Sequence, residues 1–258
     1  MYDHFLIIVP FHKAGHRIAW HKLLLEGKDY DYVDNVLSEL ESKVGELNLS
    51  SHIVSTETKD VQSIKEKDKF FSDIAFIENE EEFLFYYKSE VTLNASDVAT
   101  FILSYGNDIT HLKLQKLLYL CYEDFFIKYK KTLFDDKILA FPYGPVIKNV
   151  YDEYSEHGKN TIKFKEDDSV FFSKLDFKGT PSFSKILFSE NGIIAMESIL
   201  STLKKHISKT AFDLVNITHK KGTPWSKVFQ EKTFPKEITV NVIEEYVLEL
   251  EKKYSKNY

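Results

Sequence analysis

Residues 110–128 read THLKLQKLLYLCYEDFFIK, a pattern that predicts one long helix with apolar side chains around most of its circumference. At 100° per residue the charged side chains, Lys116 among them, gather in one arc, and Thr110 supplies an N-terminal cap. Such a helix is expected at the centre of a helical domain. Gln115 projects beside Tyr119 on the apolar side, where an unpaired amide costs about 1–3 kcal/mol, so we expect it to have a fixed hydrogen-bond partner.

The segments around this helix predict a mostly helical domain over residues 93–258. Asn94 is an N-terminal cap candidate, and the apolar face that follows it closes at Gly106. Alternating apolar residues at 162–164 and 170–172 predict a small β-hairpin. Apolar residues at helical spacing predict three further helices, at residues 192–206, 209–218 and 240–253.

A rigid turn, Pro142-Tyr143-Gly144-Pro145, lies between the helices of this domain and follows an extended segment at 138–141. Proline is favoured at the first position of a helix. We therefore expect Pro145 to begin a helix that runs to about Glu156, with Tyr143 held at its N-terminus.

Residues 1–92 predict a separate, small α+β domain. Residues 5–9 form a continuous apolar run stopped by Pro10, which is typical of a strand buried on both faces. The other elements expected are a helix at 30–47, short strands at 53–54 and 74–77, and a loop at 56–69. The fold class is therefore α+β overall, with a small α+β domain followed by a mostly α-helical domain that carries a small β-hairpin.

The composition is that of a folded globular protein. The 258 residues are 43% hydrophobic and include only nine glycines and six prolines. The longest apolar run is far shorter than the roughly 20 residues that span a bilayer, and no basic stretch leads to a cleavage site. We therefore expect a cytoplasmic protein without membrane insertion. A single cysteine, Cys121, excludes an internal disulfide and a thiolate metal site.

The charged residues argue against nucleic acid as a partner. Of the 34 basic residues only Arg17 is arginine, whereas proteins that read bases rely on the bidentate arginine fork. Charge is also uneven along the chain. Residues 1–92 carry 10 basic and 18 acidic side chains, a net charge of −8, while residues 93–258 carry 24 and 22.

No motif predicts catalysis or a metal site. Cys121 and His219 could form a nucleophile and base, but Cys121 lies on the apolar arc of the central helix, where a thiol is inert packing. His12 and His16 have a metal-ligand spacing, yet Gly15 lies between them and the glutamate of the zincin motif is missing. Nucleotide-binding and hydrolase motifs are absent from the sequence. We expect no catalytic residues, no metal and no cofactor.

Two short segments remain that local structure explains poorly. In residues 141–146 two prolines and a glycine fix the backbone around Tyr143, which makes either a stiff connection or a rigid aromatic presented to a partner. Thr218-His219, followed by Pro224-Trp225, ends a helix with a polar pair and an aromatic. This second segment indicates either core packing, with His219 bonded to a carbonyl, or direct contact with a ligand.

Taken together, these segments resemble the Panacea domain, the antitoxin domain of SocA-like proteins, which are common in prophages and bacterial toxin–antitoxin pairs. The resemblance covers about residues 94–230, and the chain has Phe141 or Pro142 where the family usually has tryptophan. Nothing in residues 1–92 resembles a known family. The matching stretches are residues 110–119, 140–146, Val150-Tyr151, Thr218-His219 and Pro224-Trp225.

The resemblance implies a domain that neutralises a toxin encoded beside it by protein–protein contact, without catalysis. Because family members pair with very different toxins, we expect the added residues 1–92 to tune partner choice. Our hypothesis is that their acidic surface covers a cationic toxin face, so that charge reversal at Glu39, Glu41 and Glu46 slows binding. The residues expected to define or line the shared site are Gln115, Lys116, Tyr119, Tyr143, Gly144, Pro145, Val146, His219 and Trp225.

The leading interpretation is therefore a cytoplasmic bacterial antitoxin, a binding protein and not an enzyme, whose partner is a protein toxin from a neighbouring gene. One alternative is a protease adaptor that delivers the toxin for degradation. Others are a DNA-binding regulator of its own operon and a hydrolase built around His219. The sequence leaves the formation of a homo-oligomer open.

Overall fold

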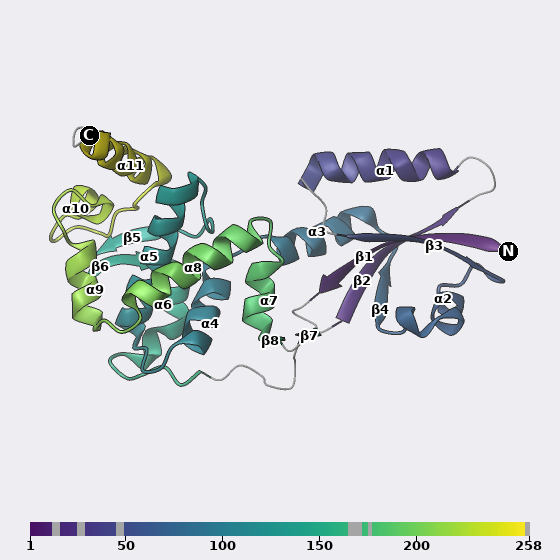
Figure 1. The fold of residues 1–258 in the computed structure, drawn as a ribbon, viewed down its shortest axis with the longest axis horizontal. Helices are drawn as coiled ribbons and strands as arrows, with labels where there is room; N and C mark the ends of the chain where they lie inside the picture. The colour runs from purple at the N-terminus through teal and green to yellow at the C-terminus, as the bar shows by residue number, and fades with distance from the viewer. Residues whose placement is uncertain (12–15, 25–28, 45–48, 165–171, 175–176, 256–258) are drawn as a thin grey trace. The chain divides into compact units, whose positions relative to one another are not determined.

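The computed structural model of the chain describes residues 1–11, 16–24, 29–44, 49–164, 172–174 and 177–255 (Figure 1). The chain forms two compact units. The N-terminal unit comprises Met1–Thr92 and Phe188–Glu190, and the C-terminal unit comprises Leu93–Leu187 and Asn191–Tyr258. The short segment Phe188–Glu190 is bonded to the rest of the N-terminal unit, because the Glu190 N–H donates to the Val91 carbonyl at 2.9 Å.

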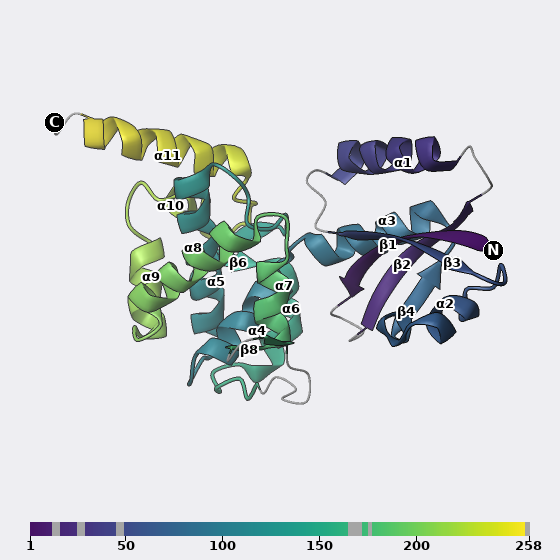
Figure 2. The same ribbon diagram turned by 45° about the vertical axis from the view of Figure 1, so that its right-hand side comes forward.

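A four-stranded sheet with the order β3-β1-β2-β4 forms the N-terminal unit. Strand β1 (Tyr2–Phe11) pairs antiparallel with β2 (His16–Leu24) and with β3 (Ser50–Thr56). The short strand β4 (Ile74–Ile77) runs parallel to β2. Figure 2 shows helix α1 on one side of this sheet and helix α2 on the other.

Both faces of β1 are buried because helices cover the sheet on each side. Helices α1 (Asp29–Val44) and α3 (Glu80–Val91) supply side chains to one core cluster, together with Phe5, Ile7 and Val9. The second cluster holds Leu6 and Ile8, with side chains from α2 (Gln62–Lys67) and the 3-10 helix Lys69–Phe71. The period of two assigns alternate residues to opposite faces. The predicted strand buried on both faces is confirmed.

Two predictions for the N-terminal unit were wrong, and one strand was missed. Pro10 does not stop β1, because the β1–β3 pairing ends at Ile8 and Pro10 is paired only with Arg17 of β2. A proline is tolerated where its missing N–H would face no partner strand. Strand β2 was not predicted, and the expected loop at 56–69 contains α2. Residues 45–48, which include Glu46, lie outside the described residues.

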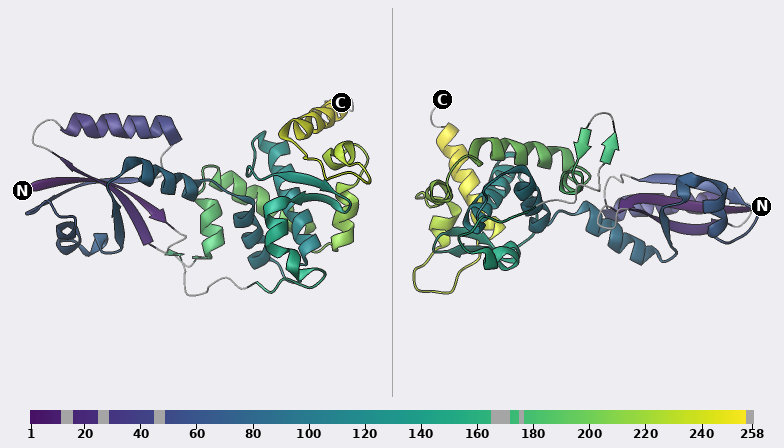
Figure 3. Two further views of the ribbon diagram at one scale, coloured as in Figure 1. Left: turned by 180° about the vertical axis from the view of Figure 1, so that it is seen from behind. Right: turned by 90° about the horizontal axis from the view of Figure 1, so that it is seen from below.

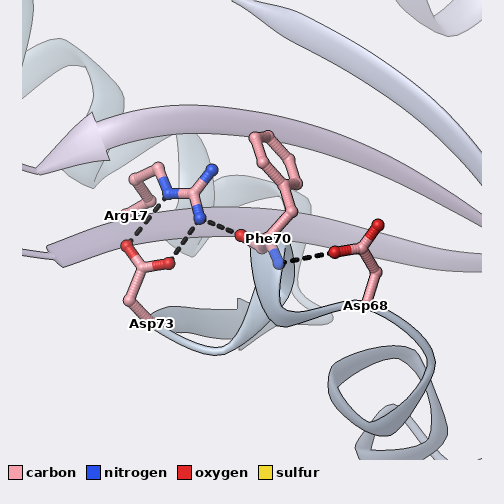
Figure 4. A network of polar contacts seen from close by, with 4 residues as sticks. All are labelled: Arg17, Asp68, Phe70 and Asp73. Atoms are coloured by element: carbon pink, nitrogen blue, oxygen red, sulfur yellow. Dashed lines mark hydrogen bonds and ion pairs between the residues drawn. The ribbon is translucent and has the colours of Figure 1, made fainter.

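Arg17, the only arginine, connects β2 to the turn that precedes β4 (Figure 4). Its Nε donates to Asp73 Oδ2 at 2.9 Å, its Nη2 donates to Asp73 Oδ1 and to the Phe70 carbonyl, and the guanidinium lies 4.3 Å from the centre of the Phe70 ring. The hydrogen bond from Arg17 lowers the pKa of Asp73. Asp68 caps the same turn by accepting from the Phe70 N–H at 2.8 Å. The Arg17 guanidinium therefore holds the turn before β4 against strand β2.

Helix α5 (His111–Tyr129) is the central element of the C-terminal unit, as predicted. It packs against α4 (Ala95–Tyr105), α8 (Gly192–His206), α9 (Ala211–Thr218) and the hairpin of β5 (Ile138–Phe141) with β6 (Gly144–Ile147). Asn94 and Thr110 cap α4 and α5 as expected. The remaining elements are α6 (Lys148–Tyr154), the 3-10 helix Ser155–His157, β7 (Phe172–Lys174), β8 (Phe177–Gly179), α7 (Pro181–Leu187), α10 (Pro224–Val228) and α11 (Val240–Ser255). Figure 3 shows the ribbon from behind and from below.

The prediction for Pro145 was wrong. Pro145 lies in β6 opposite Ala140, and the following helix α6 begins only at Lys148. The φ angle that proline fixes suits an extended segment as well as a first helical turn, so the residue alone does not distinguish them. The decisive feature is Gly144, whose φ of +100° reverses the chain so that β6 pairs back onto β5.

The small hairpin also lies elsewhere than expected. It is formed by β7 and β8, whereas residues 162–164 are irregular and the Ile162 N–H donates to the Ile109 carbonyl at 2.9 Å. Most of the second expected strand, up to residue 171, lies outside the described residues. The fold class, a small α+β unit followed by a mostly helical unit with a small hairpin, is confirmed. None of the helices in the described part of the chain has the length and apolarity needed to cross a membrane.

Candidate partner-binding site at the β5–β6 hairpin

The turn between β5 and β6 presents an aromatic side chain to solvent. Phe141 pairs with Gly144, so Pro142 and Tyr143 form the tip of the hairpin. Tyr143 is 63% exposed. Two prolines and the positive φ of Gly144 fix the backbone on both sides of it. Tyr143 therefore stands at a hairpin tip and not at a helix N-terminus.

Three side chains from two helices hold the backbone of this hairpin. The Gln115 Oε1 accepts a hydrogen bond from the Ile147 N–H at 2.8 Å. The Lys116 Nζ donates to the Pro145 carbonyl, and the Trp225 Nε1 donates to the Phe141 carbonyl at 2.8 Å. The expectation that Gln115 has a fixed partner is confirmed. These bonds fix the orientation in which the tip is presented.

The polar groups of α5 and α9 converge on Gly144. A Cβ atom at this position would lie 2.9 Å from Lys116 Nζ, 2.9 Å from Thr218 Oγ1 and 3.2 Å from His219 Nε2. These distances are shorter than ordinary contacts of a Cβ atom. Only glycine fits, so the hairpin can approach α5 and α9 closely.

Lys116 is buried in an unusual electrostatic environment. The side chain is 0% exposed, and among the described residues no carboxylate forms an ion pair with it. Burial lowers its pKa to about 7. Lys116 lies in the arc of α5 where the helical wheel places charged side chains, but the hairpin covers this part of the helix and removes Lys116 from water.

An aromatic stack supports the hairpin from the side of α9 and α10. The His219 ring lies 3.6 Å from the Trp225 ring with an angle of 11° between the planes, and Phe229 stacks on Trp225 at 4.6 Å. Trp225 is 8% exposed, so of the two alternatives the core-packing interpretation applies to it. Burial and the nearby Lys116 lower the pKa of His219, while a backbone hydrogen bond with Tyr143 raises it.

Not every predicted site residue contributes to this cluster. The Tyr119 hydroxyl donates to Glu123 Oε1 at 2.8 Å inside the helical core. Burial raises the pKa of Glu123 to about 7. Val146 is buried opposite Leu139, and Pro145 contributes its carbonyl only. The structure therefore brings together Gln115, Lys116, Tyr143, Gly144, Pro145, His219 and Trp225, and places Tyr119 and Val146 in the core.

Thr218 belongs to the site although it was not predicted as a site residue. Thr218 contacts the position of the missing Cβ of Gly144, and His111 packs on Tyr151 with 4.8 Å between the ring centres. His111 Nε2, like His219 Nε2 and Gln115 Nε2, is buried without a hydrogen-bond partner among the described residues. Thr218 and His111 lie within the stretches 218–219 and 110–119 that carry the family resemblance, and this position was the only indication in the sequence.

The polar side chains of this cluster are suited to bind the backbone of the hairpin. It offers amide, ammonium, imidazole and hydroxyl groups around two carbonyls, and its contacts with the other described residues include no carboxylate. Among the described residues no group of three or more His, Cys, Asp and Glu is placed to hold a metal. Cys121 is fully buried, and burial raises the pKa of its thiol.

Comparison with known families places this site within a match to one family. Residues 114–226 match the family described as Antitoxin SocA-like, Panacea domain. This range includes the hairpin, most of α5, α9 and the start of α10. The resemblance identified from the motifs is thereby confirmed. No curated protein and no solved structure matches the chain.

Proposed function

We propose that this chain, which carries a Panacea domain of the SocA-like antitoxin family, neutralises a protein toxin encoded by a neighbouring gene through direct binding in the bacterial cytoplasm. The observation that carries the proposal is the family match over residues 114–226. The anchored hairpin supports a binding role, because Lys116 and Gln115 are engaged with its backbone. We propose accordingly that the chain is not an enzyme.

Co-expression of this chain with each neighbouring gene tests the proposal. We expect one neighbour to arrest growth when expressed alone, growth to be restored by this chain, and both proteins to copurify in a fixed ratio. Rescue without a complex would contradict direct neutralisation. A shortened half-life of the toxin would then indicate a protease adaptor, and a salt-sensitive gel shift with promoter DNA would indicate a regulator of the operon.

Tyr143 is the contact residue that the hairpin geometry favours. A rigid, exposed aromatic provides contact area at a low entropic cost. Replacing Tyr143 by alanine is expected to weaken binding of the copurified toxin by about thirtyfold or more, because hot-spot aromatics contribute about 2 kcal/mol or more. Calorimetric titration measures the loss.

Stability provides the control for this variant. Since the Tyr143 side chain is mostly solvent exposed, the free energy of unfolding should change by less than about 0.5 kcal/mol. Tyr143→Phe keeps the ring and should bind within a few-fold of the natural chain. Unchanged affinity in a fully folded Tyr143→Ala variant would exclude the tip as a contact.

The acidic N-terminal unit is proposed to tune the choice of toxin. Helix α1 exposes Asp34, Glu39 and Glu41 to solvent, and the residues 1–92 carry 10 basic and 18 acidic side chains. A surface of one sign accelerates association with a partner of the opposite sign. Many toxins that act on RNA or ribosomes are basic, so this surface suits them.

Reversing the charge of Glu39 and Glu41 to lysine is expected to slow association with the toxin several-fold at low salt, with little change in the dissociation rate. Stopped-flow association rates at increasing salt measure the effect, and the difference should vanish when the charges are screened. Glu39→Gln with Glu41→Gln should give an intermediate rate. Equal rates for all three proteins at low salt would disprove this role.

A further inference from the structure

Strand β3 forms one edge of the N-terminal sheet. The strand order places it outermost, and among the described residues its only strand partner is β1. Natural proteins normally shorten an edge strand or interrupt it with charged residues or proline. The seven residues of β3 include none of Lys, Arg, Asp, Glu and Pro, whereas the opposite edge strand β4 has only four residues.

The backbone of β3 has a defined orientation relative to this open edge. Lys67 of helix α2 donates a hydrogen bond to the Ser55 carbonyl, so we assign that carbonyl to the side of β3 facing away from β1. Alternate residues of a strand direct their N–H and C=O groups to the same side. Ser51 and Ile53 therefore direct their N–H and C=O groups outward, where a further strand would bond to them.

One apolar side chain of β3 offers a contact to such a strand. Ile53, at the midpoint of β3, is 42% exposed. His52 packs on the other face against Phe70 and Phe71, with ring centres 5.5 Å and 5.8 Å away, and its buried Nε2 has no hydrogen-bond partner among the described residues. The edge thus combines backbone groups that pair with no strand in the described part of the chain and an exposed apolar side chain.

Charge identifies the occupant of the edge. Ile53 pairs with Phe5, whose side chain shares a core cluster with α1, so Ile53 lies on the face of the sheet that α1 covers. The solvent side of α1 carries Asp34, Glu39 and Glu41. A second copy paired antiparallel to β3 would set two such acidic helices on the same face of one continuous sheet. A strand rich in Lys and Arg would be attracted instead.

We propose that β3 is a strand-addition site, at which a basic β-strand of a protein partner extends the N-terminal sheet. The backbone groups of Ser51 and Ile53 would bind the added strand, and the acidic surface would select its charge. The inference rests on the proposed function in one respect, since it takes the partner to be the toxin. The open edge itself is a property of the described fold.

A synthetic peptide of alternating lysine and valine tests the site on the full chain without any toxin. We expect it to bind, and a peptide of alternating glutamate and valine not to bind. Ser51→Pro removes an outward N–H at an exposed position and should weaken peptide binding by about tenfold or more. Ser51→Ala keeps the N–H and should bind like the natural chain. Thermal unfolding verifies that both variants are folded.

Other results would overturn the inference. Equal binding of the lysine peptide to the Ser51→Pro chain would place its site elsewhere, and absence of binding would leave the edge without a function in strand addition. A dimer of the free chain that Ser51→Pro dissociates would show that a second copy occupies the edge. Because the peptide assay needs no toxin, its failure is distinct from a failure of growth rescue, which concerns the proposed function.

Discussion

Replacing Gly144 by alanine is expected to destabilise the C-terminal unit by about 2–5 kcal/mol. Two costs combine. The backbone φ of +100° is strained for any residue with a Cβ. The added methyl group would also lie 2.9 Å from Lys116 Nζ and Thr218 Oγ1, both of which belong to side chains fixed in the interior. Relief of the overlap requires the hairpin to move away from α5 and α9.

Denaturant unfolding measures this loss, and Gly222 provides a matched control. Gly222 also has a positive φ, +89°, but nothing lies within 4 Å of the position of its Cβ. Gly222→Ala should therefore cost only the backbone strain, about 1–2 kcal/mol. Equal losses for the two variants would show that the close approach of Lys116, Thr218 and His219 does not limit position 144.

The C-terminal unit should become more stable as the pH rises from about 7 to 9, by about 1.4 kcal/mol per pH unit from Lys116 alone. The folded-state pKa of Lys116 is about 7, compared with 10.5 for the free side chain. Between these values the unfolded chain holds one more proton than the folded chain, so raising the pH favours folding. Below pH 7 both states are protonated and the full penalty of the buried ammonium remains.

Comparison with Lys116→Met isolates this effect, because methionine fills a similar volume and does not titrate. The difference in unfolding free energy between the two proteins should change by about 2–3 kcal/mol from pH 7 to pH 9. The comparison stops at pH 9 because two other buried groups begin to act above it. Burial raises the pKa of Cys121, and that of Tyr122 to about 12. At higher pH these groups lose protons more readily in the unfolded chain, which lowers the stability of the folded state. If the unfolding free energies of the two proteins changed equally with pH, Lys116 would not be a buried ammonium without an ion pair.

Capping and periodicity were sufficient to predict most helices from the sequence. Asn94 and Thr110 cap α4 and α5, and helix α8 begins and ends at the predicted residues 192 and 206. Strand β2 was missed because its sequence, HRIAWHKLL, lacks both a long apolar run and a regular alternation. Its pairing with β1 makes it a strand, and such a long-range contact leaves little local signal.

The sequence predicted which residues form the candidate site better than it predicted how these residues are arranged. The motifs included Gln115, Gly144 and His219, which the structure brings together at the hairpin. The burial of Lys116 could not be predicted, since a helical wheel places it among charged residues and only the tertiary contact with the hairpin removes it from water. Tyr119 was predicted for the site because it lies in the same motif, yet its hydroxyl is bonded to Glu123.

The assignment of Phe188–Glu190 to the N-terminal unit bears on how this unit could be exchanged between proteins. A single crossover after Thr92 would transfer residues 1–92 and leave behind the three residues that complete their unit. The Glu190 N–H would then lose the Val91 carbonyl to which it donates. A chimera that exchanges the whole N-terminal unit must therefore inherit two separate pieces of sequence, because the helical unit carries the second piece between α7 and α8.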